Sequence, residues 1–334
     1  MKRRLLPLLL GATLLLLTAC GAAPRGKGVG IITNVPSQSG AAAVAAALAK
    51  EREGVRLTQW ADAYRGQPEL TGETVDALAA EEEIGALLLH RAIPGSAEAL
   101  RRAREKGIFV GVCAERAEAA ELAGAADVTL LWDSESAGTL LAEQARDMGA
   151  ETLVYYTLRR LANETERQLH RSAAEAGCAA LGLIFVPKEL PDDTYDAPTP
   201  GSEAFFTADV PEKLARYGEH TAFYAANCAM QPALLRQVRA HQALYPQPCC
   251  AMGEHGLTEA DAHVAAYPMG REELELRTLY ACAERRFADE PLTENALRQL
   301  LKTLSGGACT LRRDPSAEGD GQVFLYAMRP APLT

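Results

Sequence analysis

Short apolar runs alternate with longer amphipathic segments along most of the chain from residue 28 onward. The short runs are rich in Val, Ile and Leu, and the longer segments repeat apolar residues at helical spacing. This alternation is typical of βαβ units, in which helices join parallel strands. In the first half it predicts strands at 29–33, 55–60, 86–89, 108–112 and 128–131, and helices at 38–52, 72–83, 96–106 and 116–123.

A second series of the same kind follows residue 135. It predicts helices at 136–148, 162–176, 210–217 and 232–243, and strands at 153–157, 183–187 and 222–226. Residues 188–208 contain several prolines and acidic residues, and they predict a long loop. Two series of strand–helix units predict an α/β protein with two Rossmann-like lobes, each with a parallel sheet, and a hinge between them.

The first twenty residues have the pattern of an export signal, a basic start followed by an apolar run from Leu5 to Leu17. The run is too short to span a hydrocarbon layer of ~30 Å, which takes ~20 residues. Leu17-Thr18-Ala19-Cys20 resembles the lipobox of bacterial lipoproteins, and the resemblance implies that Cys20 carries a diacylglycerol. The alternative interpretation of residues 1–20 is an ordinary secretory signal with an incidental cysteine. We expect a signal peptide at 1–19, a lipidated tether at 20–27, and a protein anchored at the extracytoplasmic face of the cell membrane.

Length and charge narrow the classes of partner. The 334 residues suit two lobes better than one core. The net charge of −10 disfavours nucleic acid and anionic membrane surfaces as partners. The sequence contains no Gly-x-Ser-x-Gly, His-Glu-x-x-His or Gly-x-x-x-x-Gly-Lys-Ser/Thr motif. We therefore expect a monomer that is not an enzyme, with no catalytic residues, metal or cofactor.

Polar residues gather just after the predicted strands. Ligands of open parallel sheets bind beyond the carboxyl ends of the strands, and amide and guanidinium groups there suit a small polar or anionic solute. Any one of these residues can instead be solvated or cap a helix. The candidate ligand-binding residues are Asn34, Ser37, Gln38, His90, Arg91, Glu115, Arg159, Asn227, Gln231, Gln247 and Tyr267.

Three of the seven cysteines that follow Cys20 stand at strand ends of the second lobe. Cys228, Cys249 and Cys250 could therefore lie close together. Thiols in proximity can form a disulfide, bind a soft metal or act as a nucleophile. No Cys-x-x-Cys pair occurs, and no histidine stands at helical spacing beside them, so the pattern favours packing over a disulfide or thiol chemistry.

Two segments have the character of crossovers between lobes. Asp133-Ser134-Glu135-Ser136-Ala137-Gly138 runs into a helix, and Ala265-Ala266-Tyr267-Pro268 precedes a predicted helix at 271–286. Both are similar to the crossovers of type I periplasmic-binding proteins, the class that includes ribose-binding proteins. The resemblance implies an N-terminal lobe of 28–134 plus 268–290 and a C-terminal lobe of 135–267 plus 291–330.

Four further stretches carry a closer resemblance: Gly30-Ile31-Ile32-Thr33, Ala92 to Ala99, Thr221 to Gln231, and Ala243 to Cys250. They are similar to an uncharacterised family of bacterial lipoproteins with this fold, a domain of unknown function. The resemblances imply a lipid-anchored solute-binding protein that serves an ABC importer through its permease. The alternatives are a surface ligand sensor for a signalling receptor and a thiol-dependent enzyme that uses Cys228 or Cys250.

Overall fold

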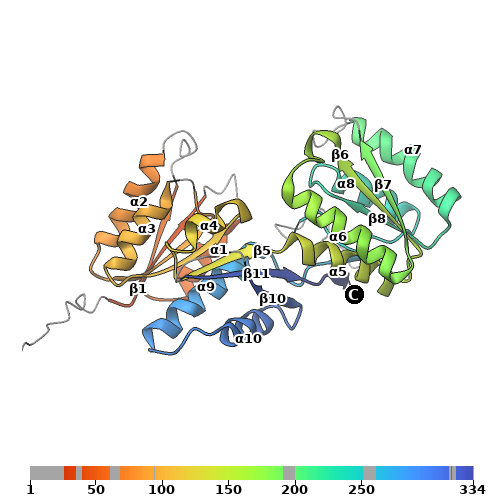
Figure 1. The fold of residues 1–334 in the computed structure, drawn as a ribbon. Helices are drawn as coiled ribbons and strands as arrows, with labels where there is room; N and C mark the ends of the chain where they lie inside the picture. Colours follow the sequence, from red (N-terminus) through yellow and green to blue (C-terminus); the bar gives the residue numbers. More distant parts are fainter. Residues whose placement is uncertain are drawn as a thin grey trace, which may run out of the picture.

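The chain folds into two α/β lobes, as the computed structural model shows (Figure 1). It describes residues 26–34, 40–60, 68–93, 95–190, 200–250, 261–315, 317 and 321–333. The predicted fold class is confirmed. The predicted signal peptide, Cys20, and the candidates Ser37 and Gln38 lie outside the described residues. Among the helices that are described, none is both long and apolar enough to cross a membrane.

A seven-stranded sheet forms the core of the first lobe, in the order β10-β11-β5-β4-β3-β1-β2. Neighbouring strands are parallel except β10 and β11, which are antiparallel. The inner strand β3 is buried at every position, which explains its unbroken apolar sequence. The strands are β1 (Gly28–Thr33), β2 (Val55–Gln59), β3 (Ile84–His90), β4 (Phe109–Ala114), β5 (Val128–Trp132), β10 (Cys309–Arg313) and β11 (Gln322–Met328).

Helices cover both faces of this sheet. On one face, α2 (Pro68–Ala80), α3 (Ser96–Glu105) and α4 (Ala119–Leu122) pack their apolar sides on β3 and β4. On the other face lie α1 (Ala41–Glu51), α9 (Arg271–Phe287) and α10 (Glu294–Leu304). A short 3-10 helix, η2 (Arg116–Glu118), follows β4.

The C-terminal segment corrects the predicted lobe boundaries. The assignment of 291–330 to the second lobe is wrong, because β11 pairs in parallel with β5 and α10 packs against α9 and β10. β11 is buried at six of its seven positions, as suits an inner strand of the larger sheet. Only β12 (Ala331–Leu333) reaches the second lobe, where it pairs with β9 (Asp261–Ala266).

The second lobe contains a smaller sheet in the order β7-β6-β8, all parallel. Parallel bridges from Ala222 to Leu244 and from Tyr245 to Val264 continue it towards β9 and β12. Helices α5 and α6 pack on one face, and α7 and α8 on the other. These elements are α5 (Ser134–Asp147), β6 (Thr152–Leu158), η3 (Arg159–Leu161), α6 (Thr165–Leu181), β7 (Ile184–Leu190), α7 (Pro200–Tyr217), β8 (Thr221–Ala225) and α8 (Gln231–Ala240).

Helix α7 occupies part of the segment that the sequence predicts as a loop. The structure extends β7 to Leu190 and begins α7 at Pro200, so residues 200–208 are helical. Phe206 and Val210 are buried in the core of the second lobe, four residues apart on one side of the helix. Proline is compatible with the first turn of a helix, so Pro200 marks a helix start where composition suggested a loop.

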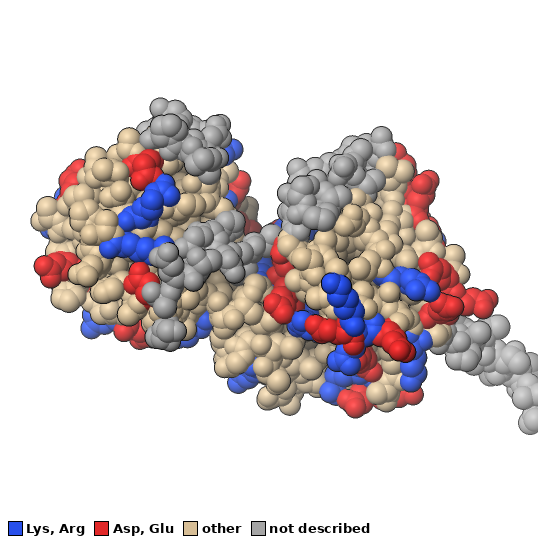
Figure 2. Space-filling view, turned by 180° about the vertical axis from the view of Figure 1, so that it is seen from behind, with Lys and Arg blue, Asp and Glu red and all other residues tan. Residues whose placement is uncertain are grey.

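Three connections join the lobes: β5 to α5, β9 to α9, and β11 to β12. The first two stand where the sequence predicts crossovers, and the third is not anticipated by the sequence. Asp133 organises the first, because its Oδ1 accepts a hydrogen bond from the Ser136 backbone and its Oδ2 accepts one from Arg312 at 2.6 Å. Seen from behind, the two lobes carry intermixed basic and acidic side chains (Figure 2).

Candidate functional site

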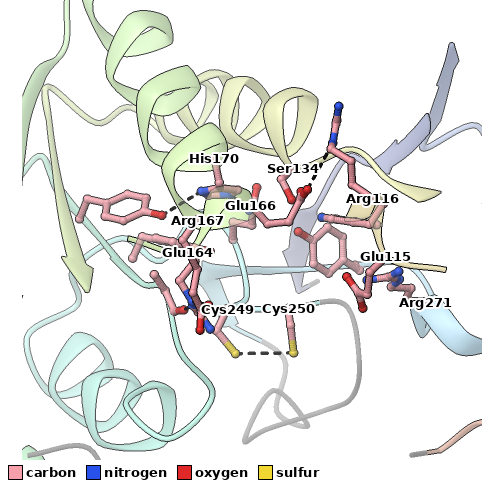
Figure 3. A pocket seen from close by; sticks show the side chains of 16 residues that line it. Glu115, Arg116, Ser134, Glu164, Glu166, Arg167, His170, Cys249, Cys250 and Arg271 are labelled. Atoms are coloured by element: carbon pink, nitrogen blue, oxygen red, sulfur yellow. Dashed lines mark hydrogen bonds and ion pairs between the residues drawn. The ribbon is translucent and has the colours of Figure 1, made fainter. Parts of the chain in front are cut away.

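A cavity of about 200 Å³ lies between the two lobes, near the carboxyl ends of β4, β5 and β8 (Figure 3). The first lobe and the crossovers contribute Glu115, Arg116, Trp132, Ser134, Tyr267 and Arg271. The second lobe contributes Tyr155, Glu164, Glu166, Arg167, His170, Tyr224, Ala226, Gln247, Cys249 and Cys250. We call this cavity the interlobe pocket. Its position matches the place where open parallel sheets bind their ligands.

An ion pair crosses the interlobe pocket. Arg116, at the start of η2 in the first lobe, places Nε 3.2 Å from Oε1 of Glu166, in the first turn of α6 in the second lobe (Figure 3). Arg116 Nη2 also lies 3.8 Å from Asp133 Oδ1 at the first crossover. The two lobes are therefore in direct electrostatic contact across the pocket.

The other two arginines of the pocket are also paired with carboxylates. Arg167 Nε donates to Glu164 Oε2 at 2.6 Å, and its Nη1 donates to the carbonyl of Ala226. Arg271 Nε donates to Glu275 Oε1 at 2.8 Å. The positive charges are thus balanced by neighbouring carboxylates, while Nε and Nη2 of Arg116 are buried without a hydrogen-bond partner among the described residues.

His170 connects the floor of the pocket to the second-lobe core. Gln247 Nε2 donates to His170 Nε2 at 3.0 Å, so the proton of the neutral ring lies on Nδ1, which is 3.1 Å from the hydroxyl oxygen of Tyr155. Burial, with a smaller contribution from the Arg167 charge, lowers the pKa of His170 to about 3. The imidazole is therefore neutral at physiological pH.

Gln247 has one polar atom without a partner. Its side chain is only 2% exposed, and its Oε1 makes no hydrogen bond to any described residue. An unsatisfied buried carbonyl costs about 1–3 kcal/mol. Since Gln247 lines the interlobe pocket, a donor group of a bound molecule could satisfy this oxygen.

Aromatic rings provide the apolar surface of the pocket. Trp132 packs edge-on against Tyr267, with ring centroids 5.9 Å apart. Tyr155 and Tyr224 form a second pair at 4.9 Å, and His170 stacks on Tyr224 at 5.1 Å. Flat rings beside hydrogen-bonding groups can bind the apolar faces of a polar solute.

A buried network beneath the pocket holds Arg271 in place. Glu275 accepts hydrogen bonds from His90 Nε2 at 3.0 Å and from the Tyr326 hydroxyl at 2.6 Å, in addition to the one from Arg271. Burial alone would raise the pKa of Glu275, but the Arg271 charge and these hydrogen bonds lower it to about 2. The carboxylate is therefore ionised and fixes the guanidinium that borders the pocket.

Three of the sequence-predicted residues line the interlobe pocket: Glu115, Gln247 and Tyr267. Arg91 lies beside them, since its Nη1 donates to Glu115 Oε1, but it is not part of the lining. His90 is directed to Glu275 instead, on the side of the sheet that α9 covers.

The other described candidates are placed away from the pocket lining. Asn34 is buried at the end of β1, and Arg159 is exposed in η3. Asn227 Oδ1 accepts a hydrogen bond from the backbone of Ala229. Gln231 Oε1 accepts from the Tyr245 hydroxyl and the Cys249 backbone. Asn227 and Gln231 thus shape the loops at the pocket rather than face it.

Arg116, Glu166, Arg167 and His170 also line the pocket and are not among the candidates predicted from the sequence. The insertion of η3 between β6 and α6 explains the last three, because it moves the helix start to Thr165. The residues that reach the pocket therefore lie in the first two turns of α6 and not directly after the strand. The run Glu164-Thr165-Glu166-Arg167 at the start of an amphipathic helix is the signal that could have identified them.

The three strand-end cysteines meet at one edge of the pocket. Cys228 Sγ lies 3.2 Å from both Cys249 Sγ and Cys250 Sγ, which are 3.8 Å from each other, and none of the described cysteines forms a disulfide. The hydrogen bond from Cys249 lowers the pKa of Cys228, but the hydrogen bond with Cys250 and burial raise it to about 11. These three sulfurs form the one set of described His, Cys, Asp or Glu side chains that is grouped closely enough to hold a metal ion.

Solved structures share this architecture. A candidate transcriptional regulator from Clostridium difficile 630 superposes with a TM-score of 0.76 at 15% identity, over 92% of this chain and 100% of that chain. The substrate-binding protein of a sugar ABC transport system from Bordetella parapertussis 12822 gives 0.53 at 13% identity, over 93% and 90%. At these identities the likeness shows the fold alone, which is the periplasmic-binding-protein type.

Sequence relatives extend the comparison. An uncharacterized protein of Treponema pallidum (strain Nichols) is 30% identical over 157 residues, which are 46% of this chain and 72% of the relative. A second uncharacterized protein of the same strain is 33% identical over 127 residues, 36% of this chain and 57% of the relative. Residues 28–260 match the family described as protein of unknown function (DUF3798). The chain therefore belongs to the DUF3798 family.

Proposed function

We propose that this protein is a lipid-anchored extracytoplasmic binding protein that holds a small polar solute between its lobes and presents it to an ABC importer. The observation that carries the proposal is Gln247 Oε1, a buried acceptor without a described partner in a pocket that both lobes line. A hydroxyl or N–H group of a solute would satisfy it. The export-signal pattern that ends at Cys20 supports the location and the anchor.

The contents of the pocket support a neutral or zwitterionic solute. Its three arginines are already paired with Glu166, Glu164 and Glu275, so a single anionic group would have to compete with existing carboxylates. The cavity of about 200 Å³ is smaller than the pockets of about 300–1,000 Å³ that bind drug-sized ligands. A monosaccharide, a polyol or an amino acid has the right size and hydrogen-bonding groups.

The fold supports a binding mechanism by hinge closure. Three connections at the lobe boundary allow the lobes to rotate, and a solute that contacts both lobes favours the closed arrangement. Trp132 and Tyr267 at the crossovers and Gln247 in the second lobe would contact the same solute from different lobes. The likeness to a sugar-transport substrate-binding protein agrees with this role.

The chemistry of the pocket supports binding without turnover. His170 is buried and neutral, with a pKa of about 3, and both of its ring nitrogens are engaged by neighbours. Hydrogen bonds with the neighbouring thiols, together with burial, raise the pKa of Cys249 well above its usual value. Neither group has the properties of a general base or an activated nucleophile at neutral pH.

Isothermal titration calorimetry against neutral sugars, polyols and amino acids tests the proposal. For a solute that binds, Gln247→Met removes the buried acceptor and should weaken the affinity about tenfold, the equivalent of about 1.4 kcal/mol. Gln237→Met is the matched control, because Gln237 lies on α8 in the same lobe and outside the pocket lining. Unchanged affinity in Gln247→Met would remove the support for this site.

A further inference from the structure

Three thiols from two separate loops converge beside the interlobe pocket. Cys228 follows β8, whereas Cys249 and Cys250 follow the short bridge that Leu244 and Tyr245 form with the second-lobe sheet. Their sulfurs lie 3.2, 3.2 and 3.8 Å apart. We propose that Cys228, Cys249 and Cys250 form a binding site for a thiophilic divalent metal ion of the Zn²⁺ type.

The triangle of sulfurs has the dimensions of three corners of a zinc site. A Zn–S bond is about 2.3 Å long, and an ion at that distance from all three sulfurs would lie about 1 Å outside their plane. This is a pyramidal arrangement with room for a fourth ligand, as in tetrahedral zinc sites that bind water or a small molecule. Thiolates are among the ligands that Zn²⁺ prefers, so donor type and geometry agree.

Neighbouring side chains fix both loops. Gln231 Oε1 accepts a hydrogen bond from the Cys249 backbone at 2.7 Å and one from the Tyr245 hydroxyl at 2.9 Å. Asn227 Oδ1 accepts one from the Ala229 backbone at 2.8 Å, which fixes the turn that carries Cys228. Such supporting contacts hold metal ligands in position before the ion binds.

The arrangement of the other cysteines shows that the cluster does not follow from cysteine content alone. Cys178 lies on α6 and is buried in the second-lobe core, while Cys113, Cys282 and Cys309 are buried in the first-lobe core. None of these four belongs to a described group that could hold a metal. The grouping is therefore specific to the two loops at the pocket.

A bound metal ion would explain why all three sulfurs lie together, whereas a disulfide would explain the proximity of only two. A disulfide needs two sulfurs about 2.05 Å apart and leaves the third thiol unused. Here each sulfur lies within 4 Å of both others, and no disulfide joins any two of them. A bound Zn²⁺ would displace the thiol protons and link the two loops, of which Cys249 and Cys250 line the pocket.

Zinc binding by the reduced full-length protein under anaerobic conditions tests the proposal. Competition with a chromophoric chelator should show one Zn²⁺ per chain, and Cd²⁺ should produce the ultraviolet thiolate-to-metal absorption band. Cys228→Ser and Cys250→Ser should each lower the zinc affinity by about 100-fold or more, while Cys178→Ala leaves it unchanged. Circular dichroism of each variant establishes that the fold is kept.

Several results would overturn the site. The first is that the protein binds no zinc although its thiols are fully reduced. The second is that Cys228→Ser binds zinc as tightly as the wild type. The third is that a disulfide within the cluster persists in excess reductant. Zn²⁺ should also raise the melting temperature of the wild type and not that of Cys250→Ser. Solute calorimetry on metal-free protein is a separate readout, so failure of the metal site and failure of solute binding are distinguishable.

Discussion

Arg116 Nε of the first lobe and Glu166 Oε1 of the second lobe lie 3.2 Å apart across the interlobe pocket. Their side chains are 28% and 33% exposed, so water partly screens the pair. An exposed ion pair of this kind contributes about 0.2–1 kcal/mol. On the proposed hinge mechanism, that is enough to favour the closed arrangement without locking it.

Neutralising either member of this pair should favour opening of the lobes. We expect Arg116→Gln and Glu166→Gln each to weaken solute affinity about two- to fivefold, and the double variant to be little weaker than either single one. A double-mutant cycle by calorimetry measures the coupling, which should decrease at high salt. Glu294→Gln with Arg298→Gln, a pair within α10, is the control and should leave the affinity unchanged. Additive losses at Arg116 and Glu166 would mean that the pair does not act across the pocket.

Replacement of His170 should change how stability depends on pH. Its pKa falls from 6.5 to about 3 on folding, so below pH 6.5 the unfolded chain binds a proton that the folded protein does not. Its neutral form therefore stabilises the fold fully above pH 6.5, and this contribution falls by about 2 kcal/mol at pH 5. Urea unfolding of His170→Gln should lack that decrease between pH 7 and pH 5. Equal slopes in His170→Gln and wild type would contradict the buried neutral imidazole.

Glu275 should be essential for stability although it does not line the pocket. Glu275→Gln leaves the Arg271 charge buried without its counter-ion, and we expect a loss of about 3–5 kcal/mol in the free energy of unfolding. Since folding lowers the pKa of Glu275 from 4.5 to about 2, the wild type keeps this contribution above pH 4.5 and loses it as the pH falls towards 2. Glu284→Gln, which breaks an exposed pair with Arg52, should cost under about 1 kcal/mol. Urea denaturation at pH 7 measures the free energy of unfolding of both variants. A similar loss of stability in Glu275→Gln and Glu284→Gln would contradict a stabilising role for the buried network around Glu275.

The proposed lipid anchor would depend on Cys20. Cys20→Ala removes the thiol that would carry the diacylglycerol, so the protein should move from the detergent phase to the aqueous phase in Triton X-114 partitioning. Cys178→Ala should stay in the detergent phase. A Cys20→Ala variant that still partitions with detergent would show that another feature holds the protein at the membrane.

The periodicity of the sequence identified most elements of both lobes because buried parallel strands and amphipathic helices leave strong patterns. It predicted no strand after 222–226, and the family resemblance placed 291–330 in the wrong lobe, since the pairing of β11 with the distant β5 depends on tertiary structure that no local pattern encodes. It also missed the first part of α7, where three prolines and acidic residues in 191–203 outweighed the buried spacing of Phe206 and Val210.

The site was predictable in position and only partly in composition. The rule that ligands bind at strand ends correctly predicted that Glu115, Gln247 and Tyr267 line the pocket. The position of the three cysteines at strand ends also predicted that they lie close together. It selected Arg159 instead of Arg167 because a 3-10 turn separates the end of β6 from the start of α6. The directions of Asn227 and Gln231 depend on local backbone hydrogen bonds, which spacing alone does not specify.

Native mass spectrometry of freshly purified protein shows whether the interlobe pocket holds a solute. We predict a fraction of molecules that carry one additional small mass, which collisional activation releases as a neutral or zwitterionic polar compound. Gln247→Met should lose this adduct, while Gln237→Met keeps it. Wild-type protein that binds the released compound no more tightly than Gln247→Met does would contradict solute binding in the interlobe pocket.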